Sequence, residues 1–234
     1  MATSLNASLQ ATATSLKENI PEPAFKIISE AKANVEKEFD VKSTIQPGQT
    51  LPEFTLSNAS GVSVNSVDLL AKGPLLIVFY RGGWCPYCNL TLRAYQQRLE
   101  DFKARGVTLV AITPEQPDSS LSTAEKNELQ FPVLTDDGLQ LARKLNITWE
   151  QPKDLVHLSA GMGADLYKRH GNDSNDMVVP TTLLVDQKAV VRNVYAEADW
   201  TKRLEPQEAV NWRVYECLEK AKINVVERLS MLDD

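Results

Sequence analysis

The chain has 234 residues, of which 43% are hydrophobic and 24% charged, with a formal net charge of −6 and a pI near 5.1. This length and composition suit one large globular domain with extensions. The acidic balance argues against a surface for nucleic acid or an anionic membrane. No stretch approaches the roughly 20 apolar residues that a membrane helix needs. The N-terminus lacks the arginines of a transit peptide and the apolar core of a secretory signal, which predicts a cytoplasmic protein.

The first part of the chain is expected to form a helical extension. Between Leu16 and Phe39, apolar residues recur at helical spacing along one stripe. Breaker residues follow from Gln46 to Pro52, which predicts a boundary there. We therefore assign residues 1–46 to an N-terminal helical extension, 47–210 to the main domain and 211–234 to a C-terminal helix.

After Pro52, short apolar runs alternate with amphipathic stretches, as in an α/β protein. The pattern predicts a central mixed sheet flanked by helices, with a right-handed parallel crossover between its first two buried strands. Residues 149–178 show no such pattern and are expected to form a long loop near the site. The predicted strands are 54–56, 75–80, 107–113, 133–134, 181–185 and 190–194, and the predicted helices are 90–105, 122–129, 139–145 and 206–232.

The chemistry is expected where the strand 75–80 leads into a helix. The residues that follow this strand include Trp84-Cys85-Pro86-Tyr87-Cys88. The carboxyl end of a parallel strand is a usual position for a site in α/β proteins. A cysteine at a helix N-terminus faces the positive end of the helix dipole, which favours the nucleophilic thiolate. The spacing of one helical turn lets the two sulfurs reach disulfide distance.

The position of each cysteine predicts its role. Cys85 is expected at the exposed tip as the attacking thiol, and Cys88, partly covered, as the resolving thiol. Pro86 suits the first helical turn. Farther along, Pro180-Thr181 precede a late strand, and we predict that the Pro180 peptide is cis and lies against Cys85. A plain turn proline is the alternative interpretation.

Several segments together carry a family resemblance. They are Leu51 to Leu56, Phe79 to Asn89, Ile112 to Glu115, Phe131 to Asp136 and Arg203 to Pro206. In these segments the chain resembles the peroxiredoxin-like branch of the alkyl hydroperoxide reductase and thiol-specific antioxidant (AhpC/TSA) family. The resemblance implies a thioredoxin-like fold and an antioxidant enzyme with a redox-active disulfide.

The site departs from the family pattern. Peroxiredoxins carry a Pro and a Thr seven and three residues before the peroxidatic Cys. If Cys88 takes that place, Arg81 and Cys85 occupy these positions, and if Cys85 takes it, Val78 and Gly82 do. Pro180-Thr181 stand where the family has an arginine before the late strand, as at the thioredoxin cis-proline. Arg81 either replaces this cation or is a solvated loop residue.

Three residues outside this motif also have chemistry-bearing side chains. Cys217 lies in a predicted helix, where a core position is favoured over a resolving thiol. His157 and His170 are expected at the surface. Because these three are scattered, they cannot complete a zinc site with Cys85 and Cys88, and we predict no metal and no other cofactor.

The leading functional interpretation is a thiol–disulfide oxidoreductase, whose Cys85–Cys88 disulfide the thioredoxin or glutathione system reduces. The alternatives are a thiol-dependent peroxidase using Cys88 or Cys85, and a non-redox binding or biosynthetic scaffold. The missing hydroxyl and arginine predict slow reaction with peroxide, because contacts to the leaving oxygen supply much of the rate. The substrate is expected to be a disulfide or a peroxide, and a homodimer is one arrangement that the sequence allows.

Overall fold

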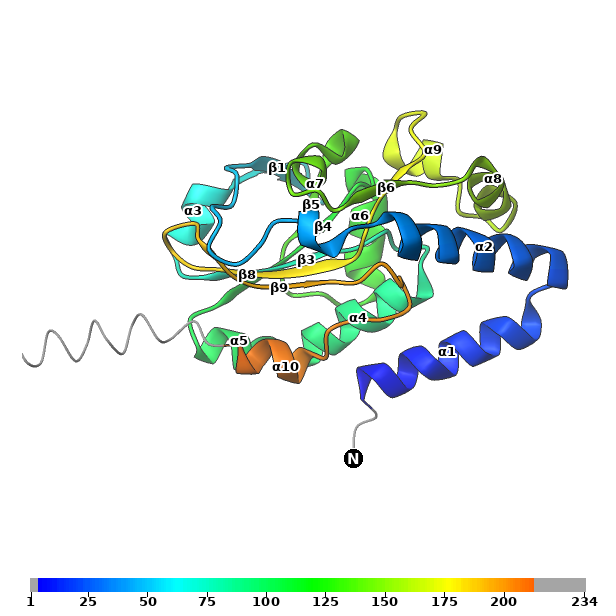
Figure 1. Cartoon of the computed structure of the whole chain (residues 1–234). Coiled ribbons are helices and arrows are strands. Elements are labelled where there is room, and N and C mark those ends of the chain that lie inside the picture. Colours follow the sequence, from blue (N-terminus) through cyan, green and yellow to red (C-terminus); the bar gives the residue numbers. More distant parts are fainter. Residues whose placement is uncertain (1–3, 213–234) are drawn as a thin grey trace, which may run out of the picture.

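The computed structural model describes residues 4–212. Its centre is a seven-stranded mixed sheet with the order β2-β1-β5-β4-β3-β8-β9 (Figure 1). A separate two-stranded sheet pairs β6 with β7. The strands are β1 (Thr55–Asn58), β2 (Ser63–Asn65), β3 (Leu75–Phe79), β4 (Thr108–Thr113), β5 (Val133–Thr135), β6 (Thr148–Glu150), β7 (Asp176–Val178), β8 (Thr181–Val185) and β9 (Val191–Ala196).

The strand β3 is buried on both faces, as its unbroken apolar sequence predicts. It pairs in parallel with β4 and antiparallel with β8, which confirms the parallel crossover. Its side chains alternate between two cores: Leu76 and Val78 belong to one apolar cluster, and Leu75 and Ile77 to the other. A thioredoxin-like sheet with helices on both faces results, as predicted from the sequence.

Helices cover the sheet on both sides (Figure 1). Residues of α4, α5 and α10 belong to the first cluster, and residues of α3, α7 and α9 to the second. The bounds are α3 (Ser66–Leu70), α4 (Pro86–Gln97), α5 (Leu99–Ala104), α6 (Pro117–Lys126), α7 (Gln140–Lys144), α9 (Leu166–His170) and α10 (Pro206–Asn211). The single helix expected over 90–105 is interrupted at Arg98, where α4 ends and α5 begins.

The N-terminal extension consists of two helices, α1 (Leu5–Asn19) and α2 (Glu22–Glu38). The sequence predicts one helix from Leu16, so most of α1 was missed. The apolar stripe of α1 is weak because Ser and Thr residues are frequent in it. Leu5 and Leu9 of this stripe are nevertheless buried. Pro21 separates the two helices because proline cannot continue α1 and is tolerated where α2 begins. They form a hairpin in which α1 contacts α4 and α2 contacts α8 (Lys153–Gly161) (Figure 1).

The segment 149–178 is not the long loop that was expected. It contains α8, α9 and the strand β7, which pairs with β6. The apolar residues Leu155, Val156, Leu166 and Met177 are buried and give the segment its share of the core. Its helices are short and its strands have three residues each, so sequence periodicity is too brief to detect.

Two further expectations from the sequence concern membrane-spanning helices and the C-terminal helix. Within residues 4–212, no helix is both long and apolar enough to span a bilayer. Of the predicted C-terminal helix, only α10 and the residues up to 212 fall within the described range, and Cys217 lies outside it.

The start of α1 is fixed to the main domain by a distant carboxylate. Glu205 accepts hydrogen bonds from the backbone N–H groups of Leu5 (3.3 Å) and Asn6 (2.7 Å). The first N–H groups of a helix have no partner within the helix, and the Glu205 carboxylate satisfies two of them. Its negative charge also interacts favourably with the helix dipole.

We predict that Glu205→Ala loosens α1 and lowers the free energy of unfolding by about 1 kcal/mol, the usual effect of losing a helix cap. Hydrogen exchange of residues 5–19 and denaturant unfolding measure the two effects. Glu208→Ala, three residues farther along, removes an equal charge without removing this cap and serves as the control. Unchanged exchange in α1 of Glu205→Ala would contradict the prediction.

Candidate functional site: a buried dithiol between two arginines

The two cysteines lie where β3 leaves the sheet and α4 begins. Cys85 is the N-cap residue of α4 and Pro86 occupies the first helical position, as the sequence predicts. Two glycines before them permit the tight connection. A Cβ on Gly82 would approach the Trp84 indole to 2.4 Å, and one on Gly83 would lie 2.0 Å from the Thr123 hydroxyl. Both positions therefore require glycine on steric grounds.

A buried carboxylate holds this loop in place. Glu115, which follows β4, is fully buried and accepts a hydrogen bond from the Gly83 N–H at 2.7 Å. Its other oxygen pairs with Arg169 Nη1 at 2.8 Å. Burial raises the pKa of the Glu115 carboxyl, although Gly83 and Arg169 act in the opposite direction. A buried carboxylate of this kind needs such partners, and here they fix the backbone beside the cysteines.

Both cysteines are free thiols and both are buried, Cys85 with 1% and Cys88 with 0% of its surface exposed. The expectation that Cys85 forms an exposed tip is therefore wrong. The sequence argument considered only α4, whereas Cys85 belongs to the same apolar cluster as Leu5, Val35 and Trp200. The N-terminal extension thus covers the dithiol.

Two buried arginines approach the thiols. Arg203 Nη2 lies 3.5 Å from Cys88 Sγ and its Nη1 donates to the backbone of Trp200 and Lys202. The Arg81 guanidinium lies 4.7 Å from the ring centroid of Trp84 and 4.8 Å from that of Trp200. With 4% of its surface exposed, Arg81 is not a solvated loop residue, and the alternative, a cation beside the cysteines, is the one that fits.

These surroundings shift the pKa values of the two thiols in opposite directions. Burial raises the pKa of Cys88, but a hydrogen bond with the Cys85 thiol, the charges of Arg203 and Arg81 and the Arg81 backbone outweigh it, so this pKa lies well below the usual value. The same hydrogen bond, burial and the charge of Cys88 raise the pKa of Cys85. The favoured state is a Cys88 thiolate that accepts a hydrogen bond from the neutral Cys85 thiol.

The other predicted residues are placed as follows. Trp84 is half-buried, Tyr87 is buried and Pro86 is exposed. No peptide bond within residues 4–212 is cis, so the prediction of a cis Pro180 is wrong. Thr181 pairs with Phe79 at the end of β3 and its hydroxyl donates to the Val179 carbonyl at 2.9 Å. This trans geometry removes the thioredoxin-like part of the sequence argument.

Sequence reasoning missed Arg203, Glu115 and Arg169 as parts of the site. Arg203 and Glu115 lie in segments that carry the family resemblance, but only the folded chain brings them to the cysteines. The histidines differ from each other: His157 is exposed, as expected, whereas His170 is buried beside Arg169. No cluster of three potential metal ligands occurs among the residues that the structure describes.

Comparisons with known proteins agree with this architecture. A thioredoxin-like sheet with a dithiol at a helix N-terminus defines the class of thioredoxin-fold thiol proteins. The AhpC/TSA family model matches residues 47–194. The chain therefore belongs to the AhpC/TSA family.

Its relatives include the chloroplastic peroxiredoxin Q of Gentiana triflora, 27% identical over 56% of this chain and 58% of the relative. Another is the chloroplastic peroxiredoxin Q of Populus jackii, 28% identical over 66% of this chain and 64% of the relative. The matches thus span less than two thirds of these relatives' length. The fold is similar to peroxidoxin BcpB of Mycobacterium tuberculosis, with a TM-score of 0.56 and 18% identity over 71% of this chain and 95% of that chain.

We predict that Arg203→Met raises the pKa of Cys88, because it removes a positive charge 3.5 Å from the sulfur. The pH dependence of Cys88 alkylation, followed on its peptide by mass spectrometry, measures this pKa. In the unchanged protein, alkylation should continue below the pH at which a free cysteine (pKa about 8.5) loses reactivity. Arg192→Met, which removes a surface arginine paired with Asp186, is the control. If Cys88 alkylation has the same pH profile in Arg203→Met as in the unchanged protein, Arg203 does not lower the pKa of Cys88.

The burial of His170 predicts that the stability of the protein also depends on pH. Burial, with a smaller effect of Arg169, lowers its pKa to about 4, while the unfolded chain binds the proton near pH 6.5. The unfolded state therefore binds more protons between these values, and stability falls as the pH drops from about 6.5 to about 4, by up to about 3 kcal/mol.

Denaturant unfolding at pH 7.5 and at pH 5 measures this loss. His170→Phe should reduce the difference between the two pH values, whereas the exposed His157→Phe should not. An equal pH dependence in both variants would show that other groups are responsible.

Proposed function

We propose that the protein is a thiol-dependent peroxidase in which Cys88 attacks the peroxide and Cys85 resolves the product. The observation that carries this proposal is the contact of Cys88 Sγ with Arg203, together with the lowered pKa of Cys88 and the raised pKa of Cys85. These roles are the reverse of those expected from the sequence. They correspond to the alternative in which Cys88, and not Cys85, takes the peroxidatic position. Relatives named peroxiredoxin support the peroxidase activity itself.

The proposed reaction has three steps. The Cys88 thiolate attacks one peroxide oxygen, the O–O bond breaks, and the products are a sulfenic acid on Cys88 and an alkoxide that takes up a proton to become an alcohol. The Cys85 thiol then condenses with the sulfenic acid to give the Cys85–Cys88 disulfide and water. A thioredoxin-type dithiol or glutathione supplies two electrons and two protons to restore both thiols.

The arginines have a defined part in the first step. Negative charge moves from the sulfur toward the leaving oxygen, and fixed cations stabilise such charge best in a site that excludes water. Arg81 and Arg203 are held by aromatic rings and backbone carbonyls rather than by carboxylates in the contacts described above. The sequence-based expectation of slow peroxide reaction rested on a missing hydroxyl and a missing arginine. Arg203 supplies a second cation beside Cys88, whereas no hydroxyl stands three residues before either cysteine.

A second candidate remains, the thiol–disulfide oxidoreductase with Cys85 as the attacking thiol. One observation favours it: Cys85, and not Cys88, lines the cavity beside the site. A non-redox scaffold is disfavoured, because burying two guanidinium groups beside two thiols costs stability unless their charge is used.

Single-cysteine variants separate these candidates. Cys85→Ser should consume about one equivalent of peroxide per chain, form a sulfenic acid that dimedone traps, and fail to turn over, since no resolving thiol remains. Cys88→Ser should consume no peroxide above the uncatalysed rate. Rapid-quench mass spectrometry with hydrogen peroxide and cumene hydroperoxide measures both.

Cys217→Ser is the matched control and should retain turnover with a dithiol reductant. If Cys88→Ser instead keeps its reaction with a glutathione mixed disulfide while Cys85→Ser loses it, the protein is a disulfide oxidoreductase. Peroxide consumption by Cys88→Ser would assign the attack to Cys85.

A further inference from the structure

A cavity of about 520 Å³ lies between the N-terminal extension and the dithiol, and we call it the chamber. Its volume lies within the usual range for a small-molecule site, about 300–1,000 Å³. Apolar side chains from α1, α2 and α8, among them Ile28 and Leu158, form its walls. Arg81 and Cys85 form part of its floor, and Cys88 does not line it. The chamber therefore reaches a guanidinium group and the neutral thiol, and not the thiolate.

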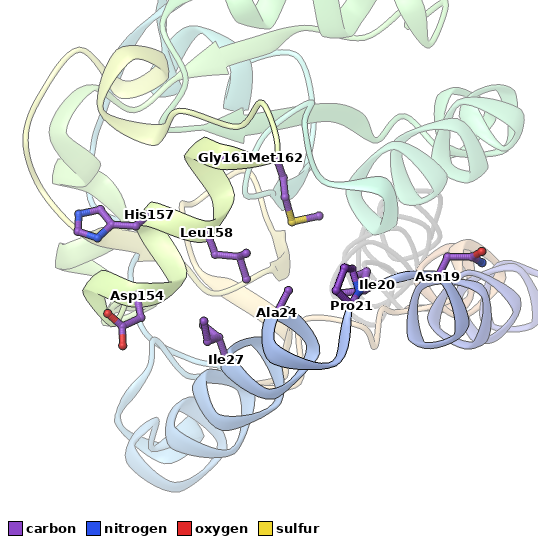
Figure 2. A pocket seen from close by; sticks show the side chains of 10 residues that line it. All are labelled: Asn19, Ile20, Pro21, Ala24, Ile27, Asp154, His157, Leu158, Gly161 and Met162. Carbon is purple, nitrogen blue, oxygen red and sulfur yellow. The ribbon is translucent and has the colours of Figure 1, made fainter.

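The chamber adjoins an outer groove of about 700 Å³ between the start of α2 and α8 (Figure 2). Ile20, Leu158 and Met162 line both spaces and so form the boundary between them. Figure 2 shows Leu158 and Met162 on one side of the groove and Pro21 and Ala24 on the other. Apolar surface therefore continues from the chamber to Met162, which has 58% of its surface exposed.

The charge of the chamber lining is opposite in sign to that of the chain. Three cations and one carboxylate line the chamber, namely Lys17, Lys32, Arg81 and Glu36, whereas the whole chain has a net charge of −6. At the rim, Lys32 is paired with Glu36 at 3.1 Å and with Asp199 at 2.9 Å. With Lys17, the rim thus has two cations and two carboxylates, which leaves Arg81 as the cation that no carboxylate balances.

The Arg81 guanidinium is buried, with 4% of the residue's surface exposed, and lies over the indole rings of Trp84 and Trp200. Within residues 4–212 it forms no ion pair with a carboxylate, and its Nε has no hydrogen-bond partner. The single Cys88 thiolate offsets only one of the two buried cations, Arg81 and Arg203. Buried polar groups in native structures are usually satisfied and buried charges are usually paired, so the Arg81 side chain indicates an anionic ligand.

The floor and the walls together define the class of that ligand. A guanidinium group matches the geometry of a carboxylate, which accepts its N–H groups in one plane. The walls bind an apolar chain, and each methylene buried against them improves affinity roughly fourfold. A carboxylate on a polar body, such as a peptide or a sugar, would leave polar groups unpaired against these walls. The ligand is therefore a carboxylate with one extended apolar chain.

We propose that the chamber binds a carboxylate with an apolar chain, whose head pairs with Arg81 and whose chain lies between α1, α2 and α8. The bound molecule covers Cys85 and adds a negative charge beside the cations that stabilise the Cys88 thiolate. It is a reversible inhibitor of the dithiol and not a substrate, since no bond to it forms or breaks. The helices α1 and α2 lie outside the family match of residues 47–194, so the site depends on this chain's own extension.

The first test compares four ligands by isothermal titration calorimetry at pH 7.5: octanoate, octan-1-ol, octylammonium and butanoate. The unchanged protein should bind octanoate at least about tenfold more tightly than the other three, because only octanoate has both the anionic head and the long chain. Octanol or octylammonium binding as tightly as octanoate would overturn the proposal, since Arg81 would then not select the head. Equal binding of butanoate and octanoate would overturn the part of the walls.

Two variants locate the bound octanoate. Ile28→Asp places a charge in the wall and should weaken octanoate binding at least about tenfold, whereas Val62→Asp, at an exposed valine in the β1–β2 connection, should not. Arg81→Met should lower the affinity for octanoate to that for octan-1-ol, whereas Arg192→Met, at the surface, should not. Octanoate binding that survives both chamber variants would overturn the proposal.

A measurement on the unchanged protein decides the matter even if a chamber variant does not fold. Saturating octanoate should raise the pKa of Cys88, because a nearby negative charge disfavours the thiolate, and should raise it by more than saturating octan-1-ol does. The midpoint of the pH profile of Cys88 alkylation measures this pKa. An unchanged midpoint would place the octanoate head away from Arg81 and overturn the proposal. None of these measurements requires turnover, so they stand or fall independently of the proposed peroxidase function.

Discussion

The rest of the structure depends on one interaction, that of the buried Cys88 thiolate with the guanidinium groups of Arg203 and Arg81. A sulfur with no exposed surface would ordinarily be neutral, because burial disfavours its charged form. Arg203, Arg81 and the Cys85 thiol reverse this preference at Cys88. The cations are costly to bury in turn, so the fold encloses Arg81 between two indole rings and ties Arg203 to backbone carbonyls.

This arrangement depends on parts that are remote in sequence. The Gly82-Gly83 connection has its shape because Glu115, after the neighbouring strand, binds its backbone. Arg203 reaches Cys88 from the segment between β9 and α10. The extension completes the enclosure from the other end of the chain, since Leu5 and Leu9 of α1 share one apolar cluster with Cys85 and Cys88. The site is therefore assembled from both chain ends and the middle of the sheet.

The sequence was sufficient for the strands with strong local patterns. The apolar runs that became β3 and β4, the start of α4 at Pro86 and the position of the dithiol were all predictable, because each depends on neighbouring residues. The burial of Cys85, the partnership of Glu115 with Gly83 and the approach of Arg203 depend on tertiary contacts that no local spacing encodes. Pro180 shows the converse error, since a familiar local motif suggested a cis peptide that this chain does not have. The expectation that Cys85 is exposed failed because the tip of an isolated helix differs from a helix covered by α1 and α2.

The enclosure of Arg81 has a spectroscopic consequence. Trp84 and Trp200 flank its guanidinium, and Trp149 stacks on Trp200 with ring centroids 5.7 Å apart and planes 16° from parallel. Three of the four tryptophans of the chain thus form one column together with the Arg81 guanidinium. Indole emission responds to nearby charge, and conversion of a thiolate to a disulfide removes a negative charge beside this column. Under the proposed catalytic cycle, tryptophan emission should therefore change when the two thiols are oxidised.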